Sequence, residues 1–247
     1  MRRPRGSLGV YAIDVVRPFG VDAFITDRVG GVSEAPYQEL NLALHVGDDP
    51  QSVAENRRRV SEAIGVASAN LVTVHQVHGH LVVDASASSS RLDADGLVTS
   101  SSTLALVILV ADCVPVLLVD AASERFAVVH AGWRGLSTGV LAHAVSRFDA
   151  PQSLHAFIGP SISQEHYQVG PDVAQHFDGL PGVLVRDVGD RSRLDLRRVS
   201  AVQLHDLGLK EEHVFASTQV TDGGETFYSD RAARPCGRFA LVAKRAS

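Results

Sequence analysis

The sequence predicts an α/β protein: one layered domain over residues 1–247, with mixed β-sheets flanked by helices. Three observations predict this class. Continuous apolar runs at 104–113 and 125–132 are typical of strands buried on both faces. Segments with helical spacing of apolar residues are mixed with strand-like segments along the whole chain. No internal repeat and no linker rich in Pro, Gly or Ser divides the sequence, so we expect a single domain.

The first third of the chain is expected to hold strands around one long helix. Residues 23–33 ("AFITDRVGGVS") alternate and then reach a Gly-Gly turn, which predicts a strand and a loop. Asp48 or Asp49 can cap a helix that begins at Pro50, and Gly65 ends it. Residues 71–85 alternate and are β-branched, so they predict a strand, a tight glycine turn and a second strand.

The rest of the chain continues this mixture. The serine-rich stretch at 85–96 is of low complexity and is interpreted as a surface loop without a function of its own. One apolar stripe over 136–148 predicts a single helix. Further segments are assigned by the same patterns: strands within 153–162, 212–220 and 238–244, and helices within 171–177 and 192–208.

Composition excludes several classes of function. The formal net charge is -5 with histidines neutral, so no broad basic surface for nucleic acid is expected, although a pocket can still be basic. The apolar window 103–122 is interrupted by Asp112 and Pro115, which argues against a membrane span. With only Cys113 and Cys236, a reduced, cytoplasmic protein is the simpler interpretation, and a single disulfide stays open. No apolar stripe lacks a place in the fold, so a monomer is expected.

Histidine and cysteine lie where apolar runs end. The string "HQVHGH" carries His75, His78 and His80, while Cys113 and His130 each end a buried run. This spacing does not match a structural zinc knuckle; three distant ligands fit a catalytic zinc with an open fourth position. From spacing alone, packing roles for a buried cysteine and strand-end histidines remain open. Asp112, beside the thiol, is a candidate to orient an imidazole, or a strand-end cap.

Several motifs resemble the laccase-domain, or polyphenol oxidase, family. They cover nearly the whole chain in order: "DRVGGVS", "LNLALHVGDDP", "ENR", "QVHG", "ADCVPVLL", "HAGWRG", "IGPSI", "YQVG" and "FYSDR". The resemblance implies a layered α/β/β/α fold similar to that of cysteine hydrolase toxins. It also implies zinc ligands at His78, Cys113 and His130. Near the C-terminus the sequence departs from the family pattern at Ser217, Ala232 and Cys236, which puts substrate contacts there in doubt.

The function that the resemblance implies is a zinc-dependent purine nucleoside phosphorylase with adenosine deaminase activity. Adenosine, inosine and 5′-methylthioadenosine, with phosphate, are the expected substrates. Arginine suits phosphate because its guanidinium binds anions through paired donors. The residues assigned to this function are, for catalysis, His78, Cys113, His130 and Asp112, and, for substrate binding, Arg28, Arg134, Asn41 and Gln76.

Two alternatives use the same residues differently. Two histidines and one cysteine also form the ligand set of a blue-copper site, so a copper-dependent polyphenol oxidase remains open. Without metal, Cys113 and His130 form a nucleophile and base pair for amide hydrolysis, which fits the cell-wall peptide editing attached to members of this family. Trp133, the only tryptophan, either stacks on a purine or fills the core beside the metal.

Overall fold

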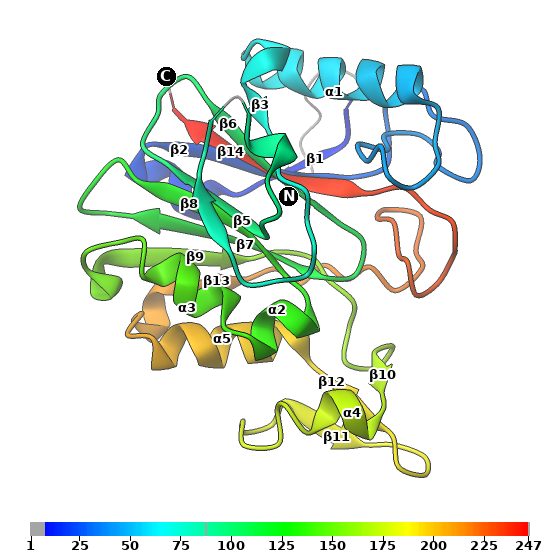
Figure 1. The fold of residues 1–247 in the computed structure, drawn as a ribbon, viewed down its shortest axis with the longest axis vertical. Helices are drawn as coiled ribbons and strands as arrows, with labels where there is room; N and C mark the ends of the chain where they lie inside the picture. The colour runs from blue at the N-terminus through cyan, green and yellow to red at the C-terminus, as the bar shows by residue number, and fades with distance from the viewer. Residues whose placement is uncertain (1–7, 87, 247) are drawn as a thin grey trace.

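The computed structural model describes residues 8–86 and 88–246, which form two large sheets packed face to face with helices outside both (Figure 1). The first sheet, sheet I, has the order β1 (Val10–Ala12), β2 (Val21–Thr26), β14 (Phe239–Arg245), β6 (Ala105–Val110), β3 (Leu71–Val72). The second sheet, sheet II, has the order β13 (Val214–Ala216), β9 (Leu154–Ile158), β7 (Val114–Asp120), β8 (Phe126–Ala131), β5 (Gly96–Thr99), β4 (Val82–Asp84).

Helices cover the outer face of each sheet. Helix α1 (Pro50–Ile64) lies over sheet I, and α2 (Trp133–Ser137), α3 (Val140–Val145) and α5 (Leu196–Asp206) lie over sheet II (Figure 1). Short 3₁₀ turns occupy η1 (Asp14–Phe19), η2 (Ser68–Asn70), η3 (Ser89–Arg91), η4 (Pro151–Ser153) and η5 (Glu211–His213). The order helix, sheet, sheet, helix confirms the expected layered α/β class with mixed sheets.

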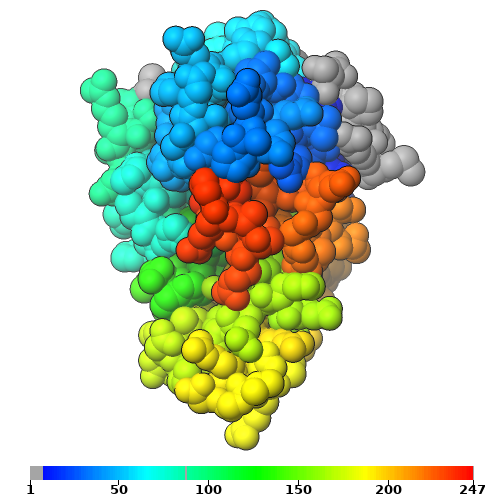
Figure 2. Space-filling view, turned by 90° about the vertical axis from the view of Figure 1, so that its right-hand side faces the viewer, coloured from blue at the N-terminus to red at the C-terminus, as the bar shows by residue number. Residues whose placement is uncertain are grey.

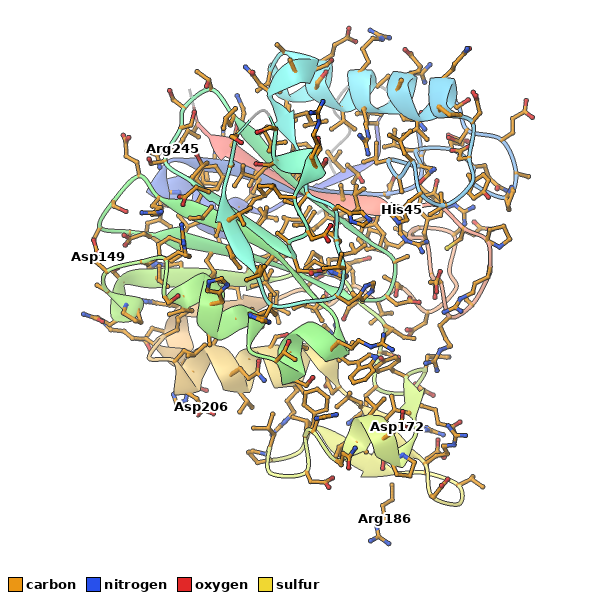
Figure 3. The ribbon with its side chains drawn as sticks, in the orientation of Figure 1. His45, Asp149, Asp172, Arg186, Asp206 and Arg245 are labelled. Carbon is orange, nitrogen blue, oxygen red and sulfur yellow. The ribbon has the colours of Figure 1, made fainter. Side chains whose placement is uncertain are left out.

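A small lobe projects below sheet II and its helices in Figure 1. It contains β10 (Gln168–Val169), α4 (Pro171–Ala174), β11 (Leu184–Arg186) and β12 (Ser192–Leu194), with β12 pairing antiparallel to both other strands. Figure 3 shows Asp172 and Arg186 on this lobe, away from the two large sheets.

The continuous apolar runs are explained by burial on both faces of a sheet. In β7, Val116 and Leu118 face the helices of sheet II, whereas Leu117 and Val119 face sheet I. All four are fully buried, and each such side chain contributes about 1.5–3 kcal/mol relative to an exposed one. The window 103–122 is therefore two core strands, β6 and β7, joined by a turn. No helix in residues 8–86 and 88–246 combines the length and apolar character needed to cross a bilayer.

The long helix begins and ends as its sequence predicts. Asp49 is the N-cap, and its carboxylate accepts hydrogen bonds from the backbone N–H groups of Gln51 and Ser52. Gly65 ends the helix in the left-handed region, at φ 69°. The choice between Asp48 and Asp49 is thus decided, and the Asp48 side chain instead accepts from Asn41.

Two of the expected elements need correction. Residues 71–85 hold two strands, as expected, but no tight turn joins them, because β3 pairs parallel to β6 in sheet I and β4 pairs parallel to β5 in sheet II. The chain between them crosses from one sheet to the other and carries the histidines. Residues 136–148 do not form one helix, because Gly139 at φ 88° separates α2 from α3, and α2 already begins at Trp133.

Candidate metal centre and its cleft

Three side chains from distant parts of the chain converge between the sheets. His78 lies in the crossing segment, Cys113 in the turn between β6 and β7, and His130 on β8. Their candidate ligand atoms all lie within 4.8 Å of one another. The two imidazole rings meet edge to face, with centroids 4.8 Å apart and planes at 79°. This set of two nitrogens and one sulfur can hold a metal ion.

The backbone at two of these positions adopts an uncommon conformation. His78 has φ 60° and Asp112, directly before Cys113, has φ 85°. They are the two non-glycine residues with positive φ in the described part of the chain. Such residues tend to cluster where a site demands a particular side-chain direction.

Gly132 leaves the space in which the three side chains meet. A Cβ atom at this position would lie 3.0 Å from Cys113 Sγ, 3.2 Å from His78 Cδ2 and 3.8 Å from His130 Cε1. Its φ of -79° is open to any residue, so the requirement for glycine here is one of space rather than of backbone freedom. The space beside Gly132 and the set of two nitrogens and one sulfur together fit a small soft cation.

A carboxylate that the sequence did not single out supports this cluster. Asp95, fully buried, accepts a hydrogen bond from His130 Nδ1 at 2.7 Å and from the backbone N–H of His78 at 2.9 Å. It lies at the end of the stretch 85–96, for which the sequence predicts a surface loop without a function of its own. The available signal was an aspartate standing directly before the buried strand β5.

The thiol and the imidazoles change each other's protonation. Burial raises the pKa of the Cys113 thiol, but the neighbouring His130 and His78 outweigh burial and lower the pKa to about 6. Burial lowers the pKa of His130, but the charge of Cys113 and the bond to Asp95 outweigh it and raise the pKa to about 9. At neutral pH the thiol therefore favours its thiolate form, which is both the nucleophile and the metal ligand.

The cluster opens into a cleft of about 530 Å³ with a cationic wall. Arg134 lies over the ring of Trp133 at 4.6 Å, and Arg231 lies over the ring of Tyr167 at 5.1 Å. No carboxylate in the described ranges forms an ion pair with either guanidinium. The cleft is lined by His45, Gln76, His78, Leu109, Val110, Ala111, Asp112, Cys113, His130, Trp133, Arg134, Tyr167, Asp230, Arg231, Arg234 and Arg238.

The C-terminal segment closes one side of the cleft. Figure 2 shows this segment, in red, between the blue N-terminal part and the yellow-green lobe. Asp230 binds the guanidinium groups of Arg234 at 2.5 Å and Arg238 at 2.9 Å, so both arginines share one carboxylate partner. Figure 3 shows His45 beside this segment, where the N-terminal and C-terminal loops meet. The sequence did not single out Arg231, Tyr167 or His45, although the motifs "YQVG", "FYSDR" and "LNLALHVGDDP" contain them.

The structure corrects the role expected for Asp112. Its carboxylate accepts hydrogen bonds from Thr221 Oγ1 at 2.6 Å and from the backbone N–H of Arg231 at 2.7 Å. It therefore ties loops together, and the carboxylate that orients an imidazole is Asp95. His130 Nδ1 binds Asp95 at 2.7 Å instead.

Two candidate substrate residues do not line the cleft. Arg28 donates from Nε to the carbonyl of Gln38 at 2.9 Å and lies over Tyr228. Asn41 is fully buried, and its amide binds Asp48 and the backbone of Ala43 and Arg238. Both side chains organise the loops around the cleft, so their expected contact with substrate is not supported.

The remaining candidates lie at the cleft. Gln76 lines it, but both ends of its amide bind the backbone of Leu109, at 2.8 and 2.9 Å, so it braces the wall. Arg134 and Trp133 line it with exposed surface, and Trp133 also packs against the core of sheet II. His75 is exposed and pairs with Asp93 at 2.7 Å, and His80 is exposed as well.

The fold and the cluster define a layered α/β protein with three side chains that could hold a metal ion in a cationic cleft. The chain belongs to the family described as multi-copper polyphenol oxidoreductase laccase, whose model matches residues 22–246. The name of this family refers to copper, whereas the curated relatives that are similar to this chain are named purine nucleoside phosphorylases.

Two such relatives match nearly the full chain. The purine nucleoside phosphorylase Rv2149c of Mycobacterium tuberculosis is 40% identical over 245 residues, with 96% of this chain and 95% of the relative covered. The purine nucleoside phosphorylase YfiH of Escherichia coli is 37% identical, with 91% and 93% covered. Among solved structures, NMB0706 of Neisseria meningitidis has a TM-score of 0.86 at 33% identity, covering 92% of this chain and 95% of its own. YlmD of Geobacillus stearothermophilus has a TM-score of 0.91 at 28% identity, covering 100% and 98%.

Proposed function

We propose that this protein is a zinc-dependent purine nucleoside phosphorylase that also deaminates adenosine, with adenosine, inosine and 5′-methylthioadenosine as substrates. One observation carries the proposal: the His78, Cys113 and His130 cluster shares a single cleft with the two unneutralised arginines, Arg134 and Arg231. The names of the relatives support the reaction type. Zinc is favoured among metals because the donor set joins a thiolate to imidazoles.

The chemistry places definite demands on the cleft. Phosphate attacks the anomeric carbon of the sugar, the bond from that carbon to the purine nitrogen breaks, and the purine leaves with the electron pair. The proton of the hydrogen phosphate ends on the purine, so inosine and phosphate give hypoxanthine and ribose 1-phosphate. The cleft must therefore hold a dianion beside the sugar and keep it oriented.

Arg134 and Arg231 are the groups proposed to hold this anion. Each guanidinium is fixed by the aromatic ring under it, and Arg231 also donates from Nη1 to the carbonyl of Gln168 at 3.1 Å. Fixed donors lose little freedom on binding a ligand, and a charge-assisted hydrogen bond is the strong kind. Arg231 thus replaces Arg28 as the second arginine proposed to bind phosphate.

A zinc ion held by His78, Cys113 and His130 would supply Lewis acidity and lower the pKa of bound water. Three protein ligands are the number typical of catalytic zinc, which keeps a position for substrate or water. This is the basis for including deamination in the proposal.

The setting that we propose is a reduced cytoplasm, and both cysteines are free, which supports it. We also propose that the protein is a monomer.

Product analysis tests the reaction. The zinc-loaded protein is incubated with inosine and phosphate, and separately with adenosine without phosphate, and products are separated by chromatography. We expect hypoxanthine and ribose 1-phosphate in the first case, and inosine and ammonia in the second. His78→Ala should abolish both activities, while His75→Ala, which removes an exposed histidine of the same segment, should leave them intact. Adenosine and 5′-methylthioadenosine are also incubated with phosphate, and if none of the three nucleosides releases its free purine base, the proposal is contradicted.

A second candidate function is favoured by one observation. Asp95, His130 and Cys113 form a chain of carboxylate, imidazole and thiol, with 2.7 Å between His130 Nδ1 and Asp95 Oδ1. This arrangement also suits a metal-free cysteine hydrolase acting on peptides. Metal content separates the two candidate functions: stoichiometric zinc occupies the thiolate, whereas a hydrolase keeps full activity in chelator.

A copper oxidase is less supported. The described residues contain one such three-ligand group, and a multinuclear copper cluster needs further histidines.

A further inference from the structure

The carboxylate of Asp95 contacts both histidines of the metal centre. Its Oδ1 accepts from His130 Nδ1 at 2.7 Å and from the His78 backbone N–H at 2.9 Å. Its Oδ2 accepts from the Gly79 N–H at 2.6 Å and, more weakly, from the Val77 N–H at 3.3 Å. One buried side chain thus collects three successive backbone donors and one ring donor.

For His130 the contact selects which ring nitrogen faces the cluster. Because Nδ1 carries the proton that it donates to Asp95, the lone pair belongs to Nε2, the nitrogen available to a metal. The backbone of Asp95 also binds His130, because the Asp95 carbonyl accepts a hydrogen bond from the His130 N–H at 2.7 Å. The ring is therefore fixed in both tautomer and position.

For His78 the contact holds an otherwise unfavourable backbone. Successive amides that point at one oxygen pair form a concave anion site, and here the anion is the protein's own carboxylate. This interaction opposes the cost of φ 60° at His78, a conformation that a non-glycine residue adopts only when its surroundings impose it. The backbone at His78 thereby helps to direct its exposed side chain toward the cluster.

We propose that Asp95 is the positioning residue that sets the metal affinity of the centre, because it holds two of the three ligands at once. The proposal rests on the metal site described above and not on the reaction, so it can be tested without a substrate.

The substitution Asp95→Asn separates this role from packing. The amide has the same shape but replaces one acceptor oxygen by an NH₂ group. In one orientation this group faces the donors of His130 and His78, and in the other it faces those of Gly79 and Val77. Either way one ligand-bearing segment loses its acceptor. Asp93→Asn is a matched control, because Asp93 lies two residues away and binds His75 Nδ1 at the same 2.7 Å, but on the exposed surface.

The experiment is a metal titration of the full chain. Wild type, Asp95→Asn and Asp93→Asn are stripped with chelator and titrated with Co²⁺, followed by the absorption of the cobalt–thiolate pair. Zinc affinity is then measured by competition with a chromophoric chelator. We expect Asp95→Asn to bind about 10- to 100-fold more weakly and Asp93→Asn to stay within about 2-fold of wild type. Circular dichroism in chelator verifies that the variants are folded.

Nitrogen-15 spectra of the histidines in wild-type zinc protein provide a readout that needs no variant. We expect the His130 proton on Nδ1 and the metal on Nε2. The opposite tautomer, or equal affinities of folded Asp95→Asn and wild type, would overturn the role of Asp95. If the wild type itself binds neither cobalt nor zinc, the three side chains do not form a metal site and this proposal is wrong. An Asp95→Asn chain that does not fold leaves the decision to the spectra of the wild type.

Discussion

The carboxylate of Asp112 accepts a hydrogen bond from the backbone N–H of Arg231 at 2.7 Å. This contact joins the turn that carries Cys113 to the C-terminal segment, across 119 positions of sequence. The metal ligand and the arginine proposed to hold phosphate are thereby kept at a fixed separation.

Asp112→Asn should weaken phosphate binding and leave metal binding intact. The amide cannot accept from both Thr221 and the Arg231 backbone as the carboxylate does. Loss of one hydrogen bond of about 0.5–1.5 kcal/mol predicts a rise of roughly 2- to 12-fold in KM for phosphate. Steady-state kinetics and zinc analysis check it, with Asp149→Asn, on an exposed loop far from the cleft (Figure 3), as control. A loss of zinc with unchanged KM would contradict this role.

Arg231→Ala should raise KM for phosphate more strongly. Hydrogen bonds to charged groups contribute about 1.5–3 kcal/mol, which corresponds to about 10- to 150-fold. Arg231→Lys should fall between, because an ammonium keeps the charge but not the paired donors. The comparison uses Arg186→Ala, an exposed arginine of the small lobe, which should behave as wild type. Equal kinetics for Arg231→Ala and Arg186→Ala would remove Arg231 from the site.

Gly132→Ala should disrupt the metal centre without unfolding the protein. The added methyl group would lie 3.0 Å from Cys113 Sγ, so the thiol or the backbone must move by a few tenths of an ångström. We expect metal affinity at least about 10-fold weaker, since ligand geometry sets affinity. Gly179→Ala is the matched substitution, because its Cβ would meet no atom within 4 Å. Wild-type cobalt spectra for Gly132→Ala would show that the three ligands do not share one ion.

The Cys113 thiol should be reactive at neutral pH in the metal-free protein. Its pKa of about 6 means that the thiolate fraction, and with it the iodoacetamide rate, rises with pH through that value and levels off above pH 7. Zinc should protect the thiol. Cys236 is buried with a raised pKa and should react slowly, which the Cys113→Ser variant measures separately. A rate in the metal-free wild type that climbs only near pH 8 or above would contradict the cluster.

Local sequence patterns predict a helix or strand correctly where the residues of that element alone determine it. The helix from Pro50 follows from an aspartate cap and a terminal glycine, and the core strands follow from runs that are apolar on both faces. The tight turn expected within 71–85 is wrong because pairing partners are not encoded locally: β3 and β4 each pair with a parallel neighbour in a different sheet. The residues between them therefore cross from one sheet to the other.

The site divides in the same way. His78, Cys113 and His130 are recognisable from their motifs and do converge. The carboxylate that orients His130 is Asp95, whereas the sequence suggests Asp112 as a candidate to orient an imidazole. The residues that hydrogen-bond to the ligand side chains depend on which side of a turn a carboxylate faces. At Asp112, where φ is positive, the carboxylate binds Thr221. Asn41 has the chemistry of a binding residue, but burial commits its amide to the backbone.

The central claim is that two imidazoles and one thiolate bind a single metal ion. An anomalous difference map at the zinc absorption edge, from crystals of the native protein, tests it most directly. We expect one peak about 2.3 Å from Cys113 Sγ and about 2.0–2.1 Å from one nitrogen each of His78 and His130. A fully zinc-loaded protein whose map has no peak between these three side chains would contradict the account.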